Sequence, residues 1–310
     1  MQSRLRYPLV GLAGALLIAV YGHTVVWLWG RWTMSVWHNA HGALVPPAVG
    51  YLAYTELKGR RFGPAHTTAW GFALVVPALL LHVLDTGMNT GLLSALSIVL
   101  LLPGLSLLFL GLERTRAIAF PLAFMLFALP IPLSLTEQVH LVLRHIAANA
   151  SAVLVPLFGI VVYLEGTTLH LASATLAIED ACSGFSTLYA AAAMACLVAY
   201  QTDTRWRRIL VVVSAAPLAI AANIVRVTLL VIIVARTGVD VLDTWIHPAT
   251  GMLTFALALP AIMWLGRSAP SPAASTESAR SPQSAATSDP SAHGSGPNTP
   301  ASTASATSGQ

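Results

Sequence analysis

Residues 177–186 bring together side-chain types that could carry out covalent chemistry. Two carboxylates, Glu179 and Asp180, precede the thiol of Cys182, and an apolar run that we expect to be helical follows. A thiol in the first turn of a helix lies at the positive end of the helix dipole, which favours the nucleophilic thiolate, whereas the two acids oppose this effect. Gly184 leaves room for a substrate or another backbone to approach the sulfur. Cys182 is therefore a candidate nucleophile, and a small buried residue at a helix start is the alternative interpretation.

The only other cysteine is Cys196, in the same predicted helix. At a rise of ~1.5 Å per residue the two sulfurs would lie roughly 21 Å apart, far beyond the reach of a disulfide. We therefore expect Cys182 to be a free thiol and Cys196 to be a packing residue.

Arg226 lies deep in an apolar stretch, residues 221–230. A guanidinium inside a membrane span costs at least ~2.5 kcal/mol on insertion scales, and it cannot be neutralised by deprotonation, so it needs polar partners. Asn223 lies three residues earlier, on the same face of a helix. Because charges within membranes are usually functional, we expect a functional role for Arg226; a structural arginine bonded to loop carbonyls is the alternative.

His247 precedes Pro248, a residue suited to the first turn of a helix, so we expect the imidazole at the outer mouth of that helix. Asp243 could orient His247, although a solvated acid at a helix end is the simpler interpretation. The expected topology places Cys182, Arg226 and His247 in the outer halves of three successive spans. A thiol, a guanidinium and an imidazole match the nucleophile, oxyanion stabiliser and proton shuttle of a cysteine acyl-transfer site. An interfacial histidine without a catalytic role is the alternative.

The remaining histidines and glycines give no sign of a metal or cofactor. His38 and His41 are spaced as a pair of metal ligands could be, but no third ligand is evident, so we expect no metal there. His140, His145 and His170 are expected to be interface residues. The chain contains no phosphate-binding glycine loop and no Cys-x-x-Cys motif, and we expect no cofactor.

Composition places these residues in a membrane. The 310 residues are 56% hydrophobic and only 9% charged, whereas a soluble domain typically carries about 25% charged residues. Several apolar runs approach the ~20 residues needed to span a bilayer, which predicts an all-α polytopic membrane protein. The formal charge of +4 is explained by arginines and lysines in the loops. No basic patch interleaved with aromatic residues is present, so we expect the lipid bilayer, and no nucleic acid, as a partner.

Hydropathy predicts about eight transmembrane helices, at residues 8–29, 36–54, 67–83, 91–112, 117–133, 183–200, 209–235 and 248–266. Residues 136–164 are also long enough to cross, but their first half is polar and expensive in lipid. If they do not cross, most loop arginines and lysines lie on the inner side, and only Arg31, Arg144 and Arg236 lie outside. The positive-inside rule therefore favours an interfacial helix on the outer face, with both termini cytoplasmic. A re-entrant segment is the alternative.

Two further segments have a clear local character. Residues 161–171 are expected to form a β-hairpin that turns at residues 165–166, with a third short strand at residues 175–178 leading to Cys182. Residues 268–310 are rich in Ser, Ala, Pro and Thr and cannot bury a core. We therefore expect a membrane domain at residues 1–267 and a disordered cytoplasmic tail at residues 268–310.

Three short motifs occur in order, each at the outer end of a successive predicted span: Cys182-Ser183-Gly184, Asn223-x-x-Arg226 and His247-x-x-x-Gly251. Their order, spacing and shared side resemble the exosortase/archaeosortase family. The resemblance extends over residues 37–266. It includes the His41-Gly42 segment, the proline-rich residues 129–133 and the glycine hairpin before the cysteine.

The resemblance implies a membrane-embedded cysteine protease and transpeptidase, a hydrolase that processes exported proteins carrying a C-terminal sorting signal. In bacteria this signal is typically a Pro-Glu-Pro-like motif, a transmembrane helix and a basic cluster. By resemblance, Cys182 is the nucleophile that forms a thioester, His247 the general acid/base and Arg226 the oxyanion stabiliser. The supporting residues are Ser183, Gly184, Asn223 and Gly251. The expected location is the bacterial inner membrane, with the active site facing the periplasm and membrane-tethered exported proteins as partners.

Two other classes of function are open from the residues alone. In a transporter or channel, Arg226 and the outer histidines would line a substrate path. That class predicts paired broken helices or inverted repeats, which the sequence does not display. In a scaffold of an envelope-polysaccharide system, Cys182 would be merely structural.

Overall fold

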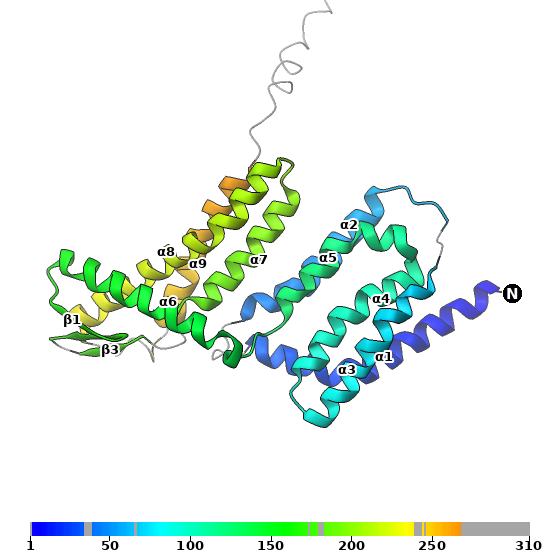
Figure 1. Ribbon diagram of the computed structural model, residues 1–310, viewed down its shortest axis with the longest axis horizontal. Helices are drawn as coiled ribbons and strands as arrows, with labels where there is room; N and C mark the ends of the chain where they lie inside the picture. The colour runs from blue at the N-terminus through cyan, green and yellow to red at the C-terminus, as the bar shows by residue number, and fades with distance from the viewer. Residues whose placement is uncertain are drawn as a thin grey trace, which may run out of the picture. The chain divides into compact units, whose positions relative to one another are not determined.

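The computed structural model describes residues 2–33, 39–64, 67–172, 174–178, 183–238, 244 and 246–267. Most of these residues are helical (Figure 1). The α-helices are α1 (Gln2–Thr33), α2 (Val45–Gly59), α3 (Phe72–Met88), α4 (Leu92–Ala117), α5 (Ala119–Phe124), α6 (Leu133–Leu154), α7 (Phe185–Gln201), α8 (Arg205–Thr237) and α9 (Ile246–Gly266). Short 3-10 helices are η2 (Ala40–Leu44), η3 (Ala69–Gly71), η4 (Met125–Ala128) and η5 (Val155–Phe158), and the strands are β1 (Val162–Glu165), β2 (Thr168–Leu171) and β3 (Thr175–Ala177).

The prediction of a polytopic, mostly helical membrane protein is confirmed, whereas the number of eight spans is not. Five segments within the described ranges are long and apolar enough to cross a bilayer: Ala69–Met88, Leu92–Ala117, Ser134–Phe158, Arg205–Thr237 and Ala249–Gly266. The chain is therefore a multi-pass membrane protein. The first predicted span lies within α1, which is 32 residues long.

Three predicted spans correspond to helices shorter than the ~20 residues that a bilayer requires. The predicted span at residues 36–54 contains the start of α2, which begins only at Val45 and has 15 residues, because prolines occupy its first turn. The predicted span at residues 117–133 is divided into α5 and η4, and extended backbone follows at Leu129. The helix α7 has 17 residues.

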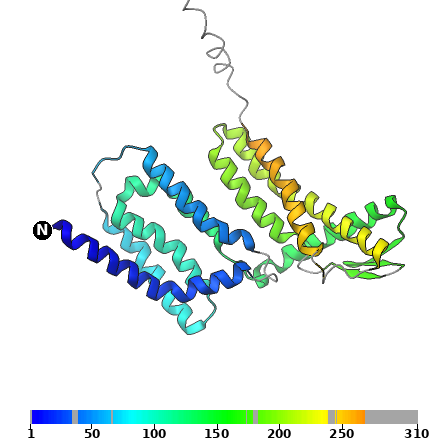
Figure 2. The ribbon, with the colours of Figure 1, turned by 180° about the vertical axis from the view of Figure 1, so that it is seen from behind.

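The segment predicted to be interfacial forms α6 and runs across α8 in both Figure 1 and Figure 2. By length and composition, Ser134–Phe158 is also one of the segments that could cross a membrane. One face of α6 is buried at the three- and four-residue spacing of a helix packed on a neighbour. Its buried residues are Thr136, His140, Leu143, Ala147, Ala148 and Ser151.

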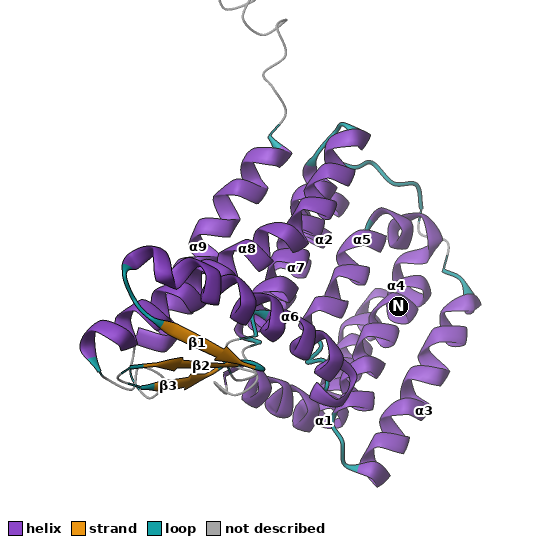
Figure 3. Cartoon of the chain, turned by 60° about the vertical axis from the view of Figure 1, so that its left-hand side comes forward, coloured by secondary structure: helices purple, strands orange, loops and turns teal. Residues whose placement is uncertain are grey.

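The predicted hairpin and third strand are confirmed. The strands form one antiparallel sheet in the order β1-β2-β3, visible in Figure 3. The pairs run from Val162 opposite Leu171 to Glu165 opposite Thr168, and Gly166 supplies the positive φ of +63° that the turn requires. After β3 the backbone N–H of Ile178 donates to the Thr167 carbonyl at 3.1 Å.

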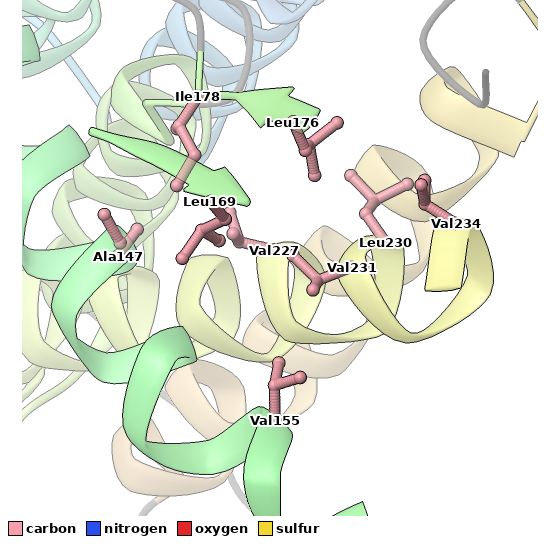
Figure 4. Packing of buried hydrophobic residues seen from close by; sticks show 10 residues of the cluster. Ala147, Val155, Leu169, Leu176, Ile178, Val227, Leu230, Val231 and Val234 are labelled. Atoms are coloured by element: carbon pink, nitrogen blue, oxygen red, sulfur yellow. The ribbon is translucent and has the colours of Figure 1, made fainter. Parts of the chain in front are cut away.

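A hydrophobic core fixes this sheet onto two helices, as Figure 4 shows. Leu169 of β2 is fully buried, and Leu176 and Ile178 from β3 and its end are nearly so. They pack with alanines of α6 and with the branched side chains of α8, whose buried members are Val227, Leu230, Val231 and Val234. The core therefore anchors the chain at Ile178, four residues before Cys182.

Helices α7, α8 and α9 lie side by side in Figures 1 and 2. Their contact is made largely of small residues, which let helix backbones approach closely within a membrane. The buried members of this contact are Ala191, Ala195, Ala199, Val211, Ala215, Ala219 and Ile262. This close packing holds the beginning of α7 near the middle of α8. The predicted tail, residues 268–310, lies outside the described residues.

Candidate active site

The chain enters α7 through a sharp turn at Gly184, where φ is +83°. A Cβ atom at this position would lie 2.4 Å from the Cγ atom of Asn223 on α8. Both the backbone conformation and the lack of space therefore demand glycine. The Nδ2 atom of Asn223 also donates to the Ser183 carbonyl at 3.1 Å, so α8 holds the residue before the turn.

Ser183 is 1% exposed, and its side chain also makes hydrogen-bond contacts. Its Oγ atom lies 2.7 Å from Nδ1 of His140 on α6, and it accepts a hydrogen bond from the Phe185 backbone N–H at 3.3 Å. The His140 and Phe185 rings are also in contact, with centroids 4.6 Å apart. Three segments of the chain therefore converge on one serine.

His140 is the residue whose importance the sequence interpretation missed. It was expected at an interface, but the structure buries it to 8% exposure beside Ser183. The sequence does carry a signal, because His140 is spaced three and seven residues from the apolar Leu143 and Ala147 on one helix face. A polar residue on the buried face of an amphipathic helix needs a partner, and that partner is here the residue after Cys182.

Arg226 lies three residues after Asn223 in α8, and both side chains are buried, at 4% and 3% exposure. The guanidinium lies against the backbone of α9, because a Cβ at Gly251 would be 3.4 Å from both Cζ and Nη2 of Arg226. Asn223 and Arg226, predicted to share one face of a helix, each contact a different neighbouring helix. Asn223 reaches the start of α7, and Arg226 reaches the first half of α9.

Two of the three predicted catalytic side chains lie outside the part of the chain that the structure describes. Cys182 lies outside the described residues, as do His38 and Asp243. The backbone of His247 is described as the second residue of α9, one helical turn before Gly251, but its side chain is not.

The five other predicted site residues are brought together. Ser183 and Gly184 contact Asn223, and Arg226 contacts Gly251, so the three motifs meet across α7, α8 and α9. This arrangement combines a buried cation with an amide and a hydroxyl whose dipoles are held in place, and the hydroxyl belongs to the residue that follows Cys182 in the sequence. Preorganised donors in a site with little water are suited to stabilising negative charge that develops during acyl transfer.

An aromatic row extends the site toward the N-terminal half of the chain. Phe185 stacks on Tyr189 at 6.2 Å between centroids, and His41 of η2 contacts Tyr189 edge-on at 5.0 Å. The Tyr189 hydroxyl donates to the Leu126 and Leu129 carbonyls at 3.2 and 3.4 Å. The His41-Gly42 segment and the proline-rich segment therefore both pack on the beginning of α7. Within the described ranges no group of three or more potential ligands could hold a metal.

Comparison with known proteins gives one match. The family model described as "Transmembrane exosortase" matches residues 29–264, about three quarters of the chain. The matched range contains all seven residues of the three motifs. Neither the curated proteins nor the solved structures include a match.

Proposed function

This chain belongs to the transmembrane exosortase family, and we propose that it is a membrane cysteine transpeptidase that cleaves the C-terminal sorting signal of exported proteins. One observation beyond the family match supports this function. Ser183 and Gly184, which directly follow the proposed nucleophile Cys182, are in contact with the Asn223-x-x-Arg226 motif, and that motif is in contact with Gly251. The three motifs of the family thus meet in one buried network.

The proposed reaction begins when His247 takes the proton of the Cys182 thiol and the resulting thiolate attacks the carbonyl carbon of the scissile peptide bond. His247 then delivers this proton to the leaving amine, so that the C–N bond breaks and a thioester forms on Cys182. An acceptor nucleophile next gives a proton to His247 and attacks the thioester carbonyl, the C–S bond breaks, and His247 returns the proton to the sulfur of Cys182. Throughout, Arg226 stabilises the oxyanion of each tetrahedral intermediate.

The burial of Arg226 supports this role. A guanidinium held in place before the reaction does not have to reorganise when the oxyanion forms, and it acts more strongly where water is excluded. Its contact with Gly251 also fixes it one helical turn from the backbone of His247 on α9. The proposed oxyanion stabiliser and the proposed proton shuttle are therefore supplied by facing elements.

We include His140 in the proposed machinery as a positioning residue. It acts through Ser183, whose hydroxyl it contacts at 2.7 Å, and not on the substrate directly. Because Ser183 is also held by Asn223, the residue after the nucleophile is fixed from α6 and from α8. This double attachment would limit the freedom of Cys182 and favour one orientation of its thiol.

The proposed substrates are membrane-tethered exported proteins whose signal is a Pro-Glu-Pro-like motif, a transmembrane helix and a basic cluster. The proposed location is the bacterial inner membrane, with the site facing the periplasm and both termini in the cytoplasm. The distribution of basic residues along the chain supports this orientation through the positive-inside rule.

The decisive experiment is cleavage of a candidate substrate in cells that lack other members of the family. Cys182→Ala should abolish cleavage and leave full-length substrate in the membrane, and Cys182→Ser should be severely impaired because a hydroxyl is far less ionised. Wild-type enzyme should also yield a covalent thioester with the substrate. Cys196→Ala is the matched control and should cleave normally. Mature product from the Cys182→Ala variant would refute the proposed transpeptidase function and would favour a transporter or a scaffold instead.

A further inference from the structure

A basic cavity of about 520 Å³ lies between the segment that follows α2 and the end of α4. Four guanidinium groups line it, with a single carboxylate among them. The residues are Arg60, Arg61, Arg114, Arg116 and Glu113. Apolar side chains, including Phe62 and Leu112, complete the wall. Nothing in the proposed transpeptidase reaction uses this cavity.

The cavity is at the opposite end of α7 from the candidate active site. Tyr200, in the last turn of α7, donates a hydrogen bond to Glu56, and Glu56 pairs with Arg60 of the cavity wall at 2.8 Å. Ser183 precedes the first turn of the same helix, whose 17 residues span roughly 25 Å at ~1.5 Å per residue. This separation approaches the ~30 Å thickness of the hydrocarbon core of a bilayer, and under the proposed topology the two sites face opposite sides of the membrane.

Contacts between its two segments hold the wall of the cavity in place. Gly111 breaks the regular geometry of α4 with φ +82° and ψ 174°, and the chain then continues through Arg114 and Arg116. Nη2 of Arg114 donates to the Gly63 carbonyl at 3.2 Å, and its guanidinium carbon lies 5.6 Å from the centre of the Phe62 ring. The two segments of the wall are therefore joined by one arginine.

Two of the four guanidinium groups are available to a ligand. Arg60 is engaged by Glu56 and Arg114 by Gly63. Arg61 and Arg116 are exposed, and neither side chain has a hydrogen bond or an ion pair within the part of the chain that the structure describes. A pair of uncommitted guanidinium forks at one cavity matches the geometry of phosphate oxygens.

We propose that this cavity binds the phosphate of an anionic phospholipid headgroup. Guanidinium groups would contact the phosphate, and the apolar wall at Phe62 and at Leu112, which is 47% exposed, would contact the glycerol and the upper acyl chain. With the proposed orientation, the cavity faces the cytoplasmic leaflet, where anionic lipids attract basic residues near the membrane. A free phosphate ion shares the charge chemistry but makes no use of the apolar wall.

Other basic residues near the same membrane face provide a matched comparison. The side chains of Arg207 and Arg208 donate to the backbone carbonyls of Arg267 and Thr202. Arg205, at the first turn of α8, is exposed but does not line this cavity. Removing the charge of Arg205 therefore changes the net charge of the interface as much as removing Arg61 does, without altering the cavity.

The test is native mass spectrometry of the full chain, released from nanodiscs containing equal amounts of phosphatidylglycerol and phosphatidylcholine. Wild-type protein should retain phosphatidylglycerol preferentially. The Arg61→Gln/Arg116→Gln double variant should bind it about tenfold more weakly, each single variant should be intermediate, and Arg205→Gln should stay within about twofold of wild type. Circular dichroism and size-exclusion profiles identify any variant that has not folded, and the single variants then carry the comparison.

Three results would overturn the proposal. They are equal retention of the two lipids by wild type, an equal loss in Arg205→Gln and the double variant, and displacement of phosphatidylglycerol by equimolar inorganic phosphate. The last result would assign the cavity to the free ion. Because the readout is lipid binding and not cleavage, it is independent of whether Cys182 is the nucleophile.

Discussion

At the scale of single residues, Ser183, which follows the proposed nucleophile in the sequence, is held by contacts from two other helices. Its hydroxyl contacts His140, its carbonyl accepts from Asn223, and the next residue is a glycine that Asn223 leaves no room to replace. Cys182 is attached covalently to this fixed point. The precision needed for nucleophilic attack can therefore come from neighbours that never contact the substrate.

The role of His140 can be tested through its contact with Ser183. His140→Ala should lower kcat of cleavage by about tenfold or more with little change in KM, because the nucleophile loses orientation while substrate contacts remain. Asparagine places a polar atom near the position of Nδ1, so His140→Asn should recover much of the activity. Ser183→Ala should resemble His140→Ala, and the double variant should be scarcely worse than either. Fully additive losses would contradict coupling through the hydroxyl.

The role of Arg226 can be tested with a lysine. Arg226→Lys keeps the positive charge but replaces a fork of donors with a single point charge. If the fork stabilises the oxyanion, turnover should fall on the order of a hundredfold, while immunoblotting shows normal accumulation in the membrane. Turnover close to that of wild type would instead make Arg226 a structural arginine.

At the scale of elements, α8 contributes most to the assembly of the candidate site. Its middle carries Asn223 toward α7 and Arg226 toward α9, and its later turns form the core beneath the sheet. The sheet in turn anchors the chain at Ile178, and α6 closes the site with His140. The small β-sheet is therefore a support for the segment that contains Cys182.

Two glycines at these helix contacts should differ in how far their replacement by alanine destabilises the protein. In Gly184→Ala the new Cβ would meet Asn223 at 2.4 Å in a left-handed conformation, which alone costs about 1–2 kcal/mol for a residue with a side chain. In Gly251→Ala the new Cβ would meet Arg226 at 3.4 Å, close to an ordinary contact, and alanine favours a helix.

Thermal unfolding in detergent measures the difference. Gly184→Ala should unfold several degrees below wild type, and Gly251→Ala should unfold close to wild type. Equal stability of the two variants would contradict the close approach of Asn223 to the start of α7.

At the scale of the whole molecule, the two sites discussed here occupy opposite ends of the same helix, α7. The candidate active site lies at its beginning, and the basic cavity is linked to its last turn through Tyr200, Glu56 and Arg60. A processing enzyme for exported proteins needs its catalytic groups on the outer face. The arginine-lined cavity then lies on the face where the positive-inside rule places basic residues.

This orientation gives a prediction for the topology. Reporter fusions after Arg116 and Arg208 should report a cytoplasmic location, and fusions near Gly166 and Asp243 should report an external one, with both termini inside. The physical reason is the concentration of basic residues on one side when α6 does not cross. A cytoplasmic signal at Gly166 would place the candidate active site on the wrong face and refute the proposed processing of exported proteins.

The amino-acid sequence is sufficient to predict the class of the protein and to propose the residues of its site. Long apolar runs predict membrane helices because their composition is costly to expose to water. The turn at residues 165–166 predicted the hairpin, because a turn is a local property of a few residues. The three-residue spacing of Asn223 and Arg226 predicted one helix face, and the ordered motifs indicated the family before the match over residues 29–264.

The contacts between distant side chains, in contrast, become visible in the tertiary structure alone. His140 and Ser183 are 43 positions apart, and hydropathy cannot distinguish a histidine facing water from one facing a serine on another helix. The demand for glycine at position 184 depends on Asn223, and the space at Gly251 is occupied by Arg226, so each requirement is set by another element. Apolar runs likewise do not define helix length, because prolines in the first turn of α2 and the 3-10 helix that follows α5 interrupt two of these runs. A sequence pattern reports the character of one segment, whereas a contact between side chains depends on how two segments are oriented in space. In this protein the orientation of α6, α7, α8 and α9 determines the geometry of the candidate site.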